Sequence, residues 1–424
     1  MRPIKDACIA ALVVSLVTLL LILPGCKSDS GSSTGPGGTI TVTGKVVTFS
    51  LLPIANSPVV ITGLPSTVTD ANGAFTISGV TPPYDITVVV SASRLGITYR
   101  GLTRSDPTIV NFLSSAPLPN AATVGGTVSG GAGYPQPATR TSAVLLTSAE
   151  TSNSTTPNGT TGAYTVSTSW TGASTLSMVL HALQWDKNAA GMPTAFTGYG
   201  AKTGVTVTAG GTFANQGIVM TTATASTVAG SITVPAGLTL FSKSMLLVFD
   251  TKGTINLGSE SGTTTSFSYA VPVVAGTSLS VTANASGVTG QSSVQKSGIA
   301  PGATGIAITL PSPPAPSLPV DAATGVTTTT PFSWTPISSV AYLLLVNGPT
   351  NQPDYLVITS SPNGTIPDLT ALGLGLPKGI GYTWNVIAFG PFANIDAAAS
   401  ATGLIPQTDL IQCQSSSRAF TTAP

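Results

Sequence analysis

The fold is decided by a stretch near the N-terminus, Ile40–Val46, which reads ITVTGKV. Apolar and polar residues alternate along it, and this period of two is typical of a β-strand with one face in a core. Its central phrase, T-V-x-G-x-V/I, occurs at three places, Thr41–Val46, Thr123–Val128 and Thr227–Ile232. Because each copy is followed by a comparable series of strand-like segments, the chain is predicted to contain three tandem repeats.

Two more segments recur in each repeat. The first is a strand after a tight turn, and in the first repeat Asn72-Gly73 provides that turn because this pair tolerates positive φ. Its copies are Ala74–Ile77, Ala163–Val166 and Phe267–Val271. The second is the next strand, at Tyr84–Val90, Thr175–Leu180 and Ser278–Ala283. Gly44-Lys45-Val46 and the turn Thr69–Phe75 resemble the carboxypeptidase regulatory-like domain. That resemblance implies a small transthyretin-like β-sandwich.

The last quarter of the chain has a different pattern. Pro311–Pro319, PSPPAPSLP, is predicted to be a stiff extended spacer because proline favours polyproline II and cannot join a central strand. Strands with large residues on one face follow it, at Phe332–Trp334, Tyr342–Val346, Tyr382–Val386 and Ser417–Thr422. Trp334, Tyr382 with Leu376 six residues before it, and Arg418-Ala419-Phe420 resemble a fibronectin type III domain. We therefore expect another β-sandwich here.

The N-terminal segment has three parts. Arg2 and Lys5 give it a positive start, Ala10–Leu23 is an apolar core, and Gly25-Cys26 follows. As an uncleaved helix the segment falls short of the ~20 apolar residues that span a bilayer. It resembles a bacterial lipoprotein signal, which implies cleavage before Cys26 and lipid attached to its thiol. Since Lys27 stands where Asp would resemble an inner-membrane retention signal, the protein is expected to be exported and anchored to the outer membrane, on its periplasmic or its surface face.

The predicted fold class is all-β, with tandem Ig-like or transthyretin-like β-sandwich domains after a lipoprotein signal peptide. The predicted units are the signal peptide 1–25, the lipidated cysteine and flexible tether 26–38, the first repeat 39–117, the second repeat 118–222, the third repeat 223–310, the spacer 311–319 and the C-terminal domain 320–424. These domains are expected to lie in a row with contacts between neighbours at most.

Composition excludes some functions. Only 7% of residues are charged and the net charge is +1, with 15 basic residues scattered singly. Nucleic-acid binding needs clustered Lys and Arg, so no nucleic-acid partner is expected. The chain has three cysteines. Cys8 lies in the signal and Cys26 would carry lipid, which leaves Cys413 as a lone thiol. No internal disulfide can form, and Cys413 is interpreted as a packing residue.

The sequence gives little support for a catalytic function. His181 is the only histidine, and Asp186 is the only possible metal ligand near it in sequence, whereas a zinc site needs three or four ligands. Gly258–Gly262 misses the spacing of a nucleophile elbow by one residue. Asp70–Gly73 resembles the start of a calcium loop, but no closing Glu follows, so a plain turn is favoured. No enzyme activity, metal or cofactor is predicted.

Aromatic residues of the second repeat suggest a binding site. Trp185 is followed by Asp186-Lys187-Asn188, which is typical of a polar loop, and a large ring in a loop is expected to be partly exposed. Trp185, Phe196 and Tyr199 are therefore candidate sugar-binding residues, since sugars stack on exposed rings. The alternative is that Trp185 packs under its own loop while Trp170 and Tyr164 lie in the core.

These patterns predict a lipid-anchored envelope protein that acts as a non-enzymatic binding or scaffolding module. Its predicted partners are the membrane, through Cys26, and polysaccharide or envelope proteins. Two alternatives stay open: a carbohydrate-binding protein that uses the second-repeat aromatics, and an accessory subunit of an envelope enzyme or transporter.

Overall fold

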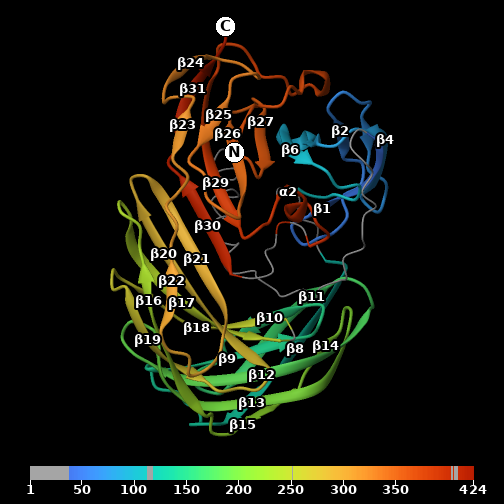
Figure 1. The fold of residues 1–424 in the computed structure, drawn as a ribbon. Helices are drawn as coiled ribbons and strands as arrows, with labels where there is room; N and C mark the ends of the chain where they lie inside the picture. The colour runs from blue at the N-terminus through green and yellow to red at the C-terminus, as the bar shows by residue number, and fades with distance from the viewer. Residues whose placement is uncertain (1–37, 112–117, 251, 403, 405–408) are drawn as a thin grey trace.

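A computed structural model of the chain describes residues 38–111, 118–250, 252–402, 404 and 409–424. The predicted signal peptide and Cys26 lie outside the described residues. Regular structure in the described part is almost entirely β-strand, as expected, with one short helix, α2 (Ile395–Ala398), and 3₁₀ turns at Ser91–Ser93 and Thr370–Leu372. Figure 1 shows the strands gathered into several packed sheets.

The three recurring phrases occupy the same place in three copies of one topology. Each lies on the central strand of a small sheet, paired antiparallel to the strand after the tight turn and parallel to a strand near the end of its repeat. In the first repeat this sheet is β4 (Ala74–Val80), β1 (Ile40–Thr48) and β7 (Thr108–Asn111); in the second, β11 (Ala163–Trp170), β8 (Asn120–Gly130), β14 (Thr212–Phe213) and β15 (Ile218–Met220); in the third, β19 (Ser266–Pro272), β16 (Ala225–Thr233) and β22 (Ile306–Thr309).

A four-stranded antiparallel sheet packs against each small sheet. In the first repeat it consists of β3 (Thr67–Val68), β2 (Pro58–Ile61), β5 (Tyr84–Val90) and β6 (Leu95–Leu102); in the second, β10 (Ser152–Thr155), β9 (Arg140–Thr147), β12 (Thr175–Lys187) and β13 (Pro193–Thr208); in the third, β18 (Thr254–Ser261), β17 (Thr239–Phe249), β20 (Thr277–Gly287) and β21 (Gly290–Ile299).

Glycine is required in the recurring phrase because a side chain at that position would overlap the neighbouring main chain. A Cβ atom at Gly44 would lie 2.6 Å from the Pro107 carbonyl oxygen, which immediately precedes β7. The equivalent Cβ at Gly126 would lie 2.3 Å from the Gln216 carbonyl oxygen, and at Gly230 it would lie 2.2 Å from that of Ile306. In all three repeats the main chain leading into or along the parallel strand therefore approaches too closely for any other residue.

The C-terminal domain is a two-sheet sandwich. One sheet consists of β23 (Pro316–Leu318), β25 (Phe332–Trp334) and β28 (Asn363–Gly364), and the other of β27 (Asp354–Thr359), β26 (Ala341–Asn347), β29 (Gly381–Gly390), β30 (Leu410–Ser415), β31 (Arg418–Thr422) and β24 (Ala323–Val326). Phe332 packs edge-on against Trp384 with ring centroids 5.0 Å apart. The Tyr382 hydroxyl donates to the Pro353 carbonyl oxygen at 3.2 Å. β23 lies within the predicted spacer, so this proline-rich stretch contributes an edge strand, a position that tolerates proline.

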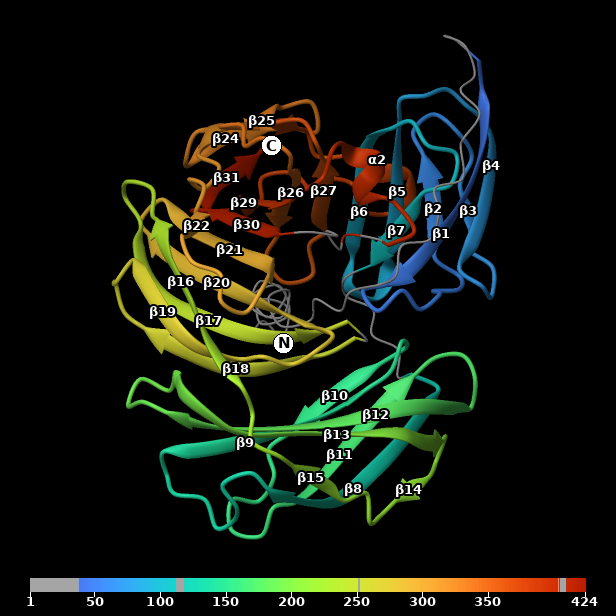
Figure 2. The same ribbon diagram turned by 60° about the horizontal axis from the view of Figure 1, so that its bottom comes forward.

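The domains do not lie in a row. β21 of the third repeat pairs antiparallel with β30, and β6 of the first repeat pairs parallel with β27. The C-terminal domain thus joins the large sheets of the first and third repeats into one sheet of 14 strands, and Figure 2 shows it between them. The expected limit to contacts between neighbours is wrong, because two edge strands of the C-terminal sheet, β27 and β30, are used for main-chain pairing.

Side chains reinforce the contact between the first repeat and the C-terminal domain. α2 lies in the long connection between β29 and β30, and its Asp396 is 293 residues from Thr103 in the chain. The Asp396 carboxylate accepts hydrogen bonds from the Thr103 amide at 2.9 Å, the Thr103 hydroxyl at 2.5 Å and the Arg104 amide at 3.2 Å. Arg104 Nη1 donates to the Asp396 carbonyl oxygen at 2.7 Å. Ile395 and Ala398 join the hydrophobic core of the first repeat.

The second repeat packs on the third through its large sheet, which is buried on both faces. On one face Val144, Leu146 and Leu180 belong to the core of the second repeat. On the other, Leu145, Leu183 and Trp185 belong to the core cluster of the third repeat. A sheet with one exposed face would place polar residues at those positions, so this double burial explains the apolar runs in β9 and β12.

We expect Gly230→Ala to destabilise the protein by about 1–3 kcal/mol, because the added methyl group overlaps the main chain of β22 and must push it away. Thermal or urea unfolding measures the change. Gly159→Ala is the matched control, since its Cβ would meet no atom within 4 Å. Equal stability of the two variants would contradict the steric account.

We expect Asp396→Ala to lower stability by about 1–2 kcal/mol, because the amides of Thr103 and Arg104 lose a charged acceptor. Hydrogen exchange should accelerate at these two amides. Asp106→Ala serves as the control, since Asp106 pairs with Arg104 but is 72% exposed, and exposed pairs contribute little. Unchanged exchange at Thr103 in Asp396→Ala would show that α2 does not hold the first repeat in place.

Candidate functional site

Two of the three predicted sugar-binding rings, Trp185 and Phe196, are buried, and Tyr199 is partly buried. Trp185 lies within strand β12 and not in a loop, and it is only 4% exposed. Phe196 is 6% exposed, and its ring centroid lies 6.3 Å from that of Trp185. Both rings pack in the core cluster of the third repeat. The expectation of an exposed Trp185 loop is therefore wrong, because the second repeat uses this face to cover the third.

Tyr199 and His181 form a polar contact at the same junction. The Tyr199 hydroxyl lies 3.0 Å from His181 Nδ1, and the His181 ring packs against Phe249 of the third repeat with centroids 4.3 Å apart. Burial lowers the pKa of His181 to about 4, so its ring is neutral at neutral pH. Asp186 does not face His181, because its carboxylate binds the Arg140 guanidinium at 2.8 and 3.2 Å.

Cys413 lies at the other junction, where β30 meets β21. Its side chain is fully buried, and its sulfur is 3.3 Å from the Ser292 hydroxyl of the third repeat. Burial raises the pKa of the thiol to about 11, which keeps it protonated at neutral pH. A protonated, buried thiol is a poor nucleophile, which agrees with the interpretation of Cys413 as a packing residue.

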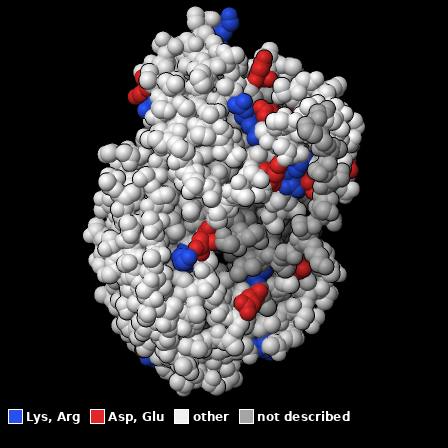
Figure 3. Space-filling view, in the orientation of Figure 1, with Lys and Arg blue, Asp and Glu red and all other residues white. Residues whose placement is uncertain are grey.

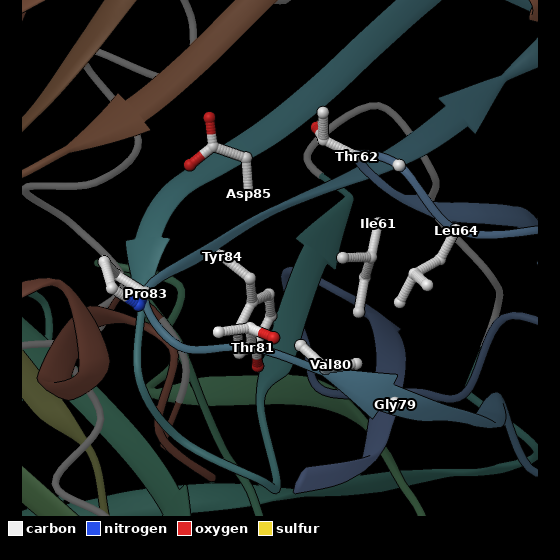
Figure 4. Close-up of a pocket in the computed structure, with 10 residues that line it drawn as sticks. Ile61, Thr62, Leu64, Gly79, Val80, Thr81, Pro83, Tyr84 and Asp85 are labelled. Carbon is white, nitrogen blue, oxygen red and sulfur yellow. The ribbon is translucent and has the colours of Figure 1, made fainter. Parts of the chain in front are cut away.

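A pocket of about 410 Å³ opens at one end of the first repeat. Figure 4 shows Ile61, Tyr84 and Val80 around it, with Thr62 and Asp85 at its border. Its volume suits a small molecule. The carboxylate of Asp85 already accepts from Arg100 Nε at 3.2 Å and from the Gly101 amide at 2.9 Å, which leaves threonine hydroxyls and main-chain groups to meet a ligand. Sequence reasoning missed this pocket because two separate segments form it.

The molecular surface carries few charges. Figure 3 shows one face on which white, uncharged residues predominate and red and blue residues often lie next to each other. The Lys296 ammonium group binds the Asp409 carboxylate at 2.7 Å across the β21–β30 junction, and Lys243 pairs with Glu260 within the third repeat. Within the described ranges, no cluster of three potential metal ligands occurs, and no helix has the length and apolarity to cross a membrane.

Comparison with known proteins gives no family. No family model matches the sequence, and no curated protein matches it. Solved structures with partial similarity include the Bacillus anthracis TIE protein, with 5% identity, a TM-score of 0.16 and coverage of 64% of this chain and 50% of that one. BcpA, the major pilin subunit of Bacillus cereus, shows 8% identity, a TM-score of 0.13 and coverage of 64% and 99%. The pilus adhesin SpaC from Lactobacillus rhamnosus GG shows 10% identity, a TM-score of 0.15 and coverage of 64% and 43%.

This chain thus covers half the length of the Bacillus anthracis TIE protein. TM-scores this low do not establish a shared arrangement of whole chains. The all-β sandwich architecture follows from the strands and sheets of this chain itself.

We expect His181 to make stability depend on pH. Its pKa of about 4 in the folded protein lies below the ordinary value of 6.5, so the unfolded chain binds the proton first as pH falls. This contribution is fully present above pH 6.5 and decreases towards pH 4, by a total of about 3 kcal/mol. Urea unfolding at several pH values measures it. His181→Gln should flatten that part of the profile, and an unchanged profile would show that His181 titrates normally.

Proposed function

We propose that this chain is an exported, lipid-anchored envelope protein that acts as a non-enzymatic scaffold. The observation that carries the proposal is the 14-stranded sheet, which connects three sandwiches through main-chain hydrogen bonds. A surface built in this way holds binding partners in fixed relative positions, as a scaffold must. This arrangement differs from the row of domains that is expected from the sequence.

The outer faces of the small sheets are suited to contacts with other molecules. On β11 the exposed residues are Ala163, Thr165, Ser167 and Ser169, and on β19 Ser266 and Ser268 are exposed. On β4, Thr76 and Ser78 are exposed. Each repeat therefore presents a hydroxyl-rich surface, which is joined in the first repeat by the exposed Lys45 of β1. Such a surface suits neutral partners, which include polysaccharides and uncharged patches of envelope proteins, better than it suits nucleic acid.

We expect Cys26→Ala to move the protein from the membrane fraction to the soluble fraction, because two or three acyl chains on Cys26 hold a protein firmly and none remains in the variant. Cell fractionation with immunoblotting measures the change. Cys8→Ala is the matched control, since it removes the other cysteine of the N-terminal segment and should leave the protein in the membrane. Membrane retention of Cys26→Ala would refute lipid anchoring through this residue.

The scaffold role is tested by formaldehyde cross-linking in the same cells. Any envelope protein held by the chain should be recovered cross-linked to it in the wild type. A cross-linked enzyme or transporter component would identify the chain as an accessory subunit. The absence of any cross-linked protein in the wild type would contradict a scaffold role towards envelope proteins.

A further inference from the structure

Strand β4 of the first repeat has a free edge, because β1 is the only described strand that pairs with it. On β1 the amide of Thr43 donates away from β4, to the carbonyl oxygen of Ser105 at 2.7 Å. Thr76 stands opposite Thr43, so its main-chain groups also point away from the β1–β4 ladder. Those of Ser78, two residues further on, point the same way. We call the outward main-chain groups of Thr76 and Ser78 the β4 edge.

The β4 edge has no hydrogen-bonding partner in the described part of the chain. At the start of the strand, the turn still satisfies Ala74, whose carbonyl oxygen accepts from the Asp70 amide at 2.9 Å and whose amide donates to the Asp70 carboxylate at 2.9 Å. Beyond it, no described group bonds to the amide or carbonyl oxygen of Thr76 or Ser78. Both residues are exposed, and the whole strand Ala74–Val80 is uncharged.

The other two repeats protect the corresponding edge. In the second repeat, the side-chain amide of Asn153 donates to the carbonyl oxygen of Ser167 at 2.5 Å, and Ser167 of β11 corresponds to Ser78 in the shared register. In the third repeat, the Lys243 ammonium group donates to the carbonyl oxygen of Ser266 on β19 at 3.2 Å, and β13 packs beside that strand. Proteins cover free sheet edges because other chains can pair with them. The first repeat has the same topology without this cover.

The pocket of about 410 Å³ lies at the end of this edge. Gly79 and Val80, the last two residues of β4, line it, and Figure 4 shows them near Ile61 and Leu64. A β-bulge between Ile77 and Val80 bends β4 at this point. Val80 and Ile61 are buried, whereas a Cβ atom at Gly79 would meet no atom within 4 Å. The pocket therefore has an aliphatic interior and an open rim on the side of β4.

A free sheet edge with a pocket at its end is suited to an extended peptide. In this mode of binding, main-chain hydrogen bonds provide affinity and the pocket selects one side chain. Among the residues that line the pocket, Asp85 alone is charged, and Arg100 and the Gly101 amide already satisfy its carboxylate. A charged side chain would find no counter-ion there, whereas a large apolar one would be removed from water. The partner is therefore expected to be uncharged and to carry an apolar residue at the pocket.

We propose that the first repeat binds an extended, uncharged segment of a partner protein, which pairs with the β4 edge and inserts one apolar side chain between Ile61, Leu64 and Val80. The bulge ends the regular edge after Ser78, so the paired stretch is short and binding depends strongly on the pocket. The proposal deepens the scaffold role, and it rests on that role only in taking the partner to be an envelope protein.

The test is fluorescence anisotropy of the full-length protein in detergent with labelled peptides of the form acetyl-Thr-Val-Thr-Xaa-Thr-Val-Thr-amide, where Xaa is Leu, Phe, Ser, Asp or Lys. The alternating pattern places Xaa and the valines on the face that turns towards the core of the sandwich. We expect saturable binding that is strongest for Leu or Phe and weaker by about fivefold or more for Asp and Lys, because the pocket offers no counter-ion.

Two variants separate the edge from the pocket. Thr76→Pro should weaken the binding of every peptide by about tenfold, because it removes an outward amide without breaking the β1–β4 ladder. Thr165→Pro is the matched control, since Thr165 takes the same place on β11 and its amide also points outward. Thr62→Trp places a large ring at the border of the pocket. It should abolish the preference for Leu over Ser, and it tests the proposal even if Thr76→Pro fails to fold.

Three results would overturn the proposal. The first is no saturable binding of any peptide at millimolar concentration. The second is binding that Thr76→Pro and Thr62→Trp leave unchanged, which would place the peptide elsewhere. The third is a wild-type dimer, measured by light scattering, that Thr76→Pro dissociates, because a second copy of this chain would then occupy the edge. None of these results affects the Cys26→Ala fractionation, so the proposed anchoring stands or falls independently.

Discussion

Main-chain pairing at two edge strands of the C-terminal sheet is the interaction on which the arrangement of this protein depends. A sandwich domain ordinarily protects its edge strands from other chains with bulges, charges or short strands. Here β30 pairs with β21 of the third repeat, and β27 pairs with β6 of the first repeat. Each junction continues a hydrogen-bonded ladder, so the domains are connected by the same interaction that forms each sheet.

Much of the local fold could be predicted from the sequence because it depends on short-range patterns. Alternation in Ile40–Val46 and the Asn72-Gly73 turn both correspond to observed strands and turns, and the Asp70 side chain accepts from the amides of Asn72 and Ala74 as a plain turn should. The arrangement of the domains was not predictable in this way. The pairing of β6 with β27 depends on which edges meet in space, and no residue pattern in either strand specifies that partner.

The candidate site residues were also only partly predictable from the sequence. Trp185 was expected in a loop because Asp186, Lys187 and Asn188 follow it, yet Asp186 and Lys187 continue the strand and Arg140 neutralises Asp186 from the neighbouring strand. Gln295 and Gln412 attracted no notice in the sequence, since glutamine in a strand is ordinary. Their burial on one face next to Ser280 and Thr282 follows from the pairing of three strands of two domains.

The pairing of β6 with β27 also has a consequence for the order in which the protein can be completed. Residues 95–99 are synthesised well before residues 354–358, their partners in the sheet. Until the C-terminal domain emerges and folds, the first repeat carries an exposed strand edge that any other extended chain could occupy. The edge of β6 therefore stays without its native partner for the whole time that the chain between these two strands is being synthesised.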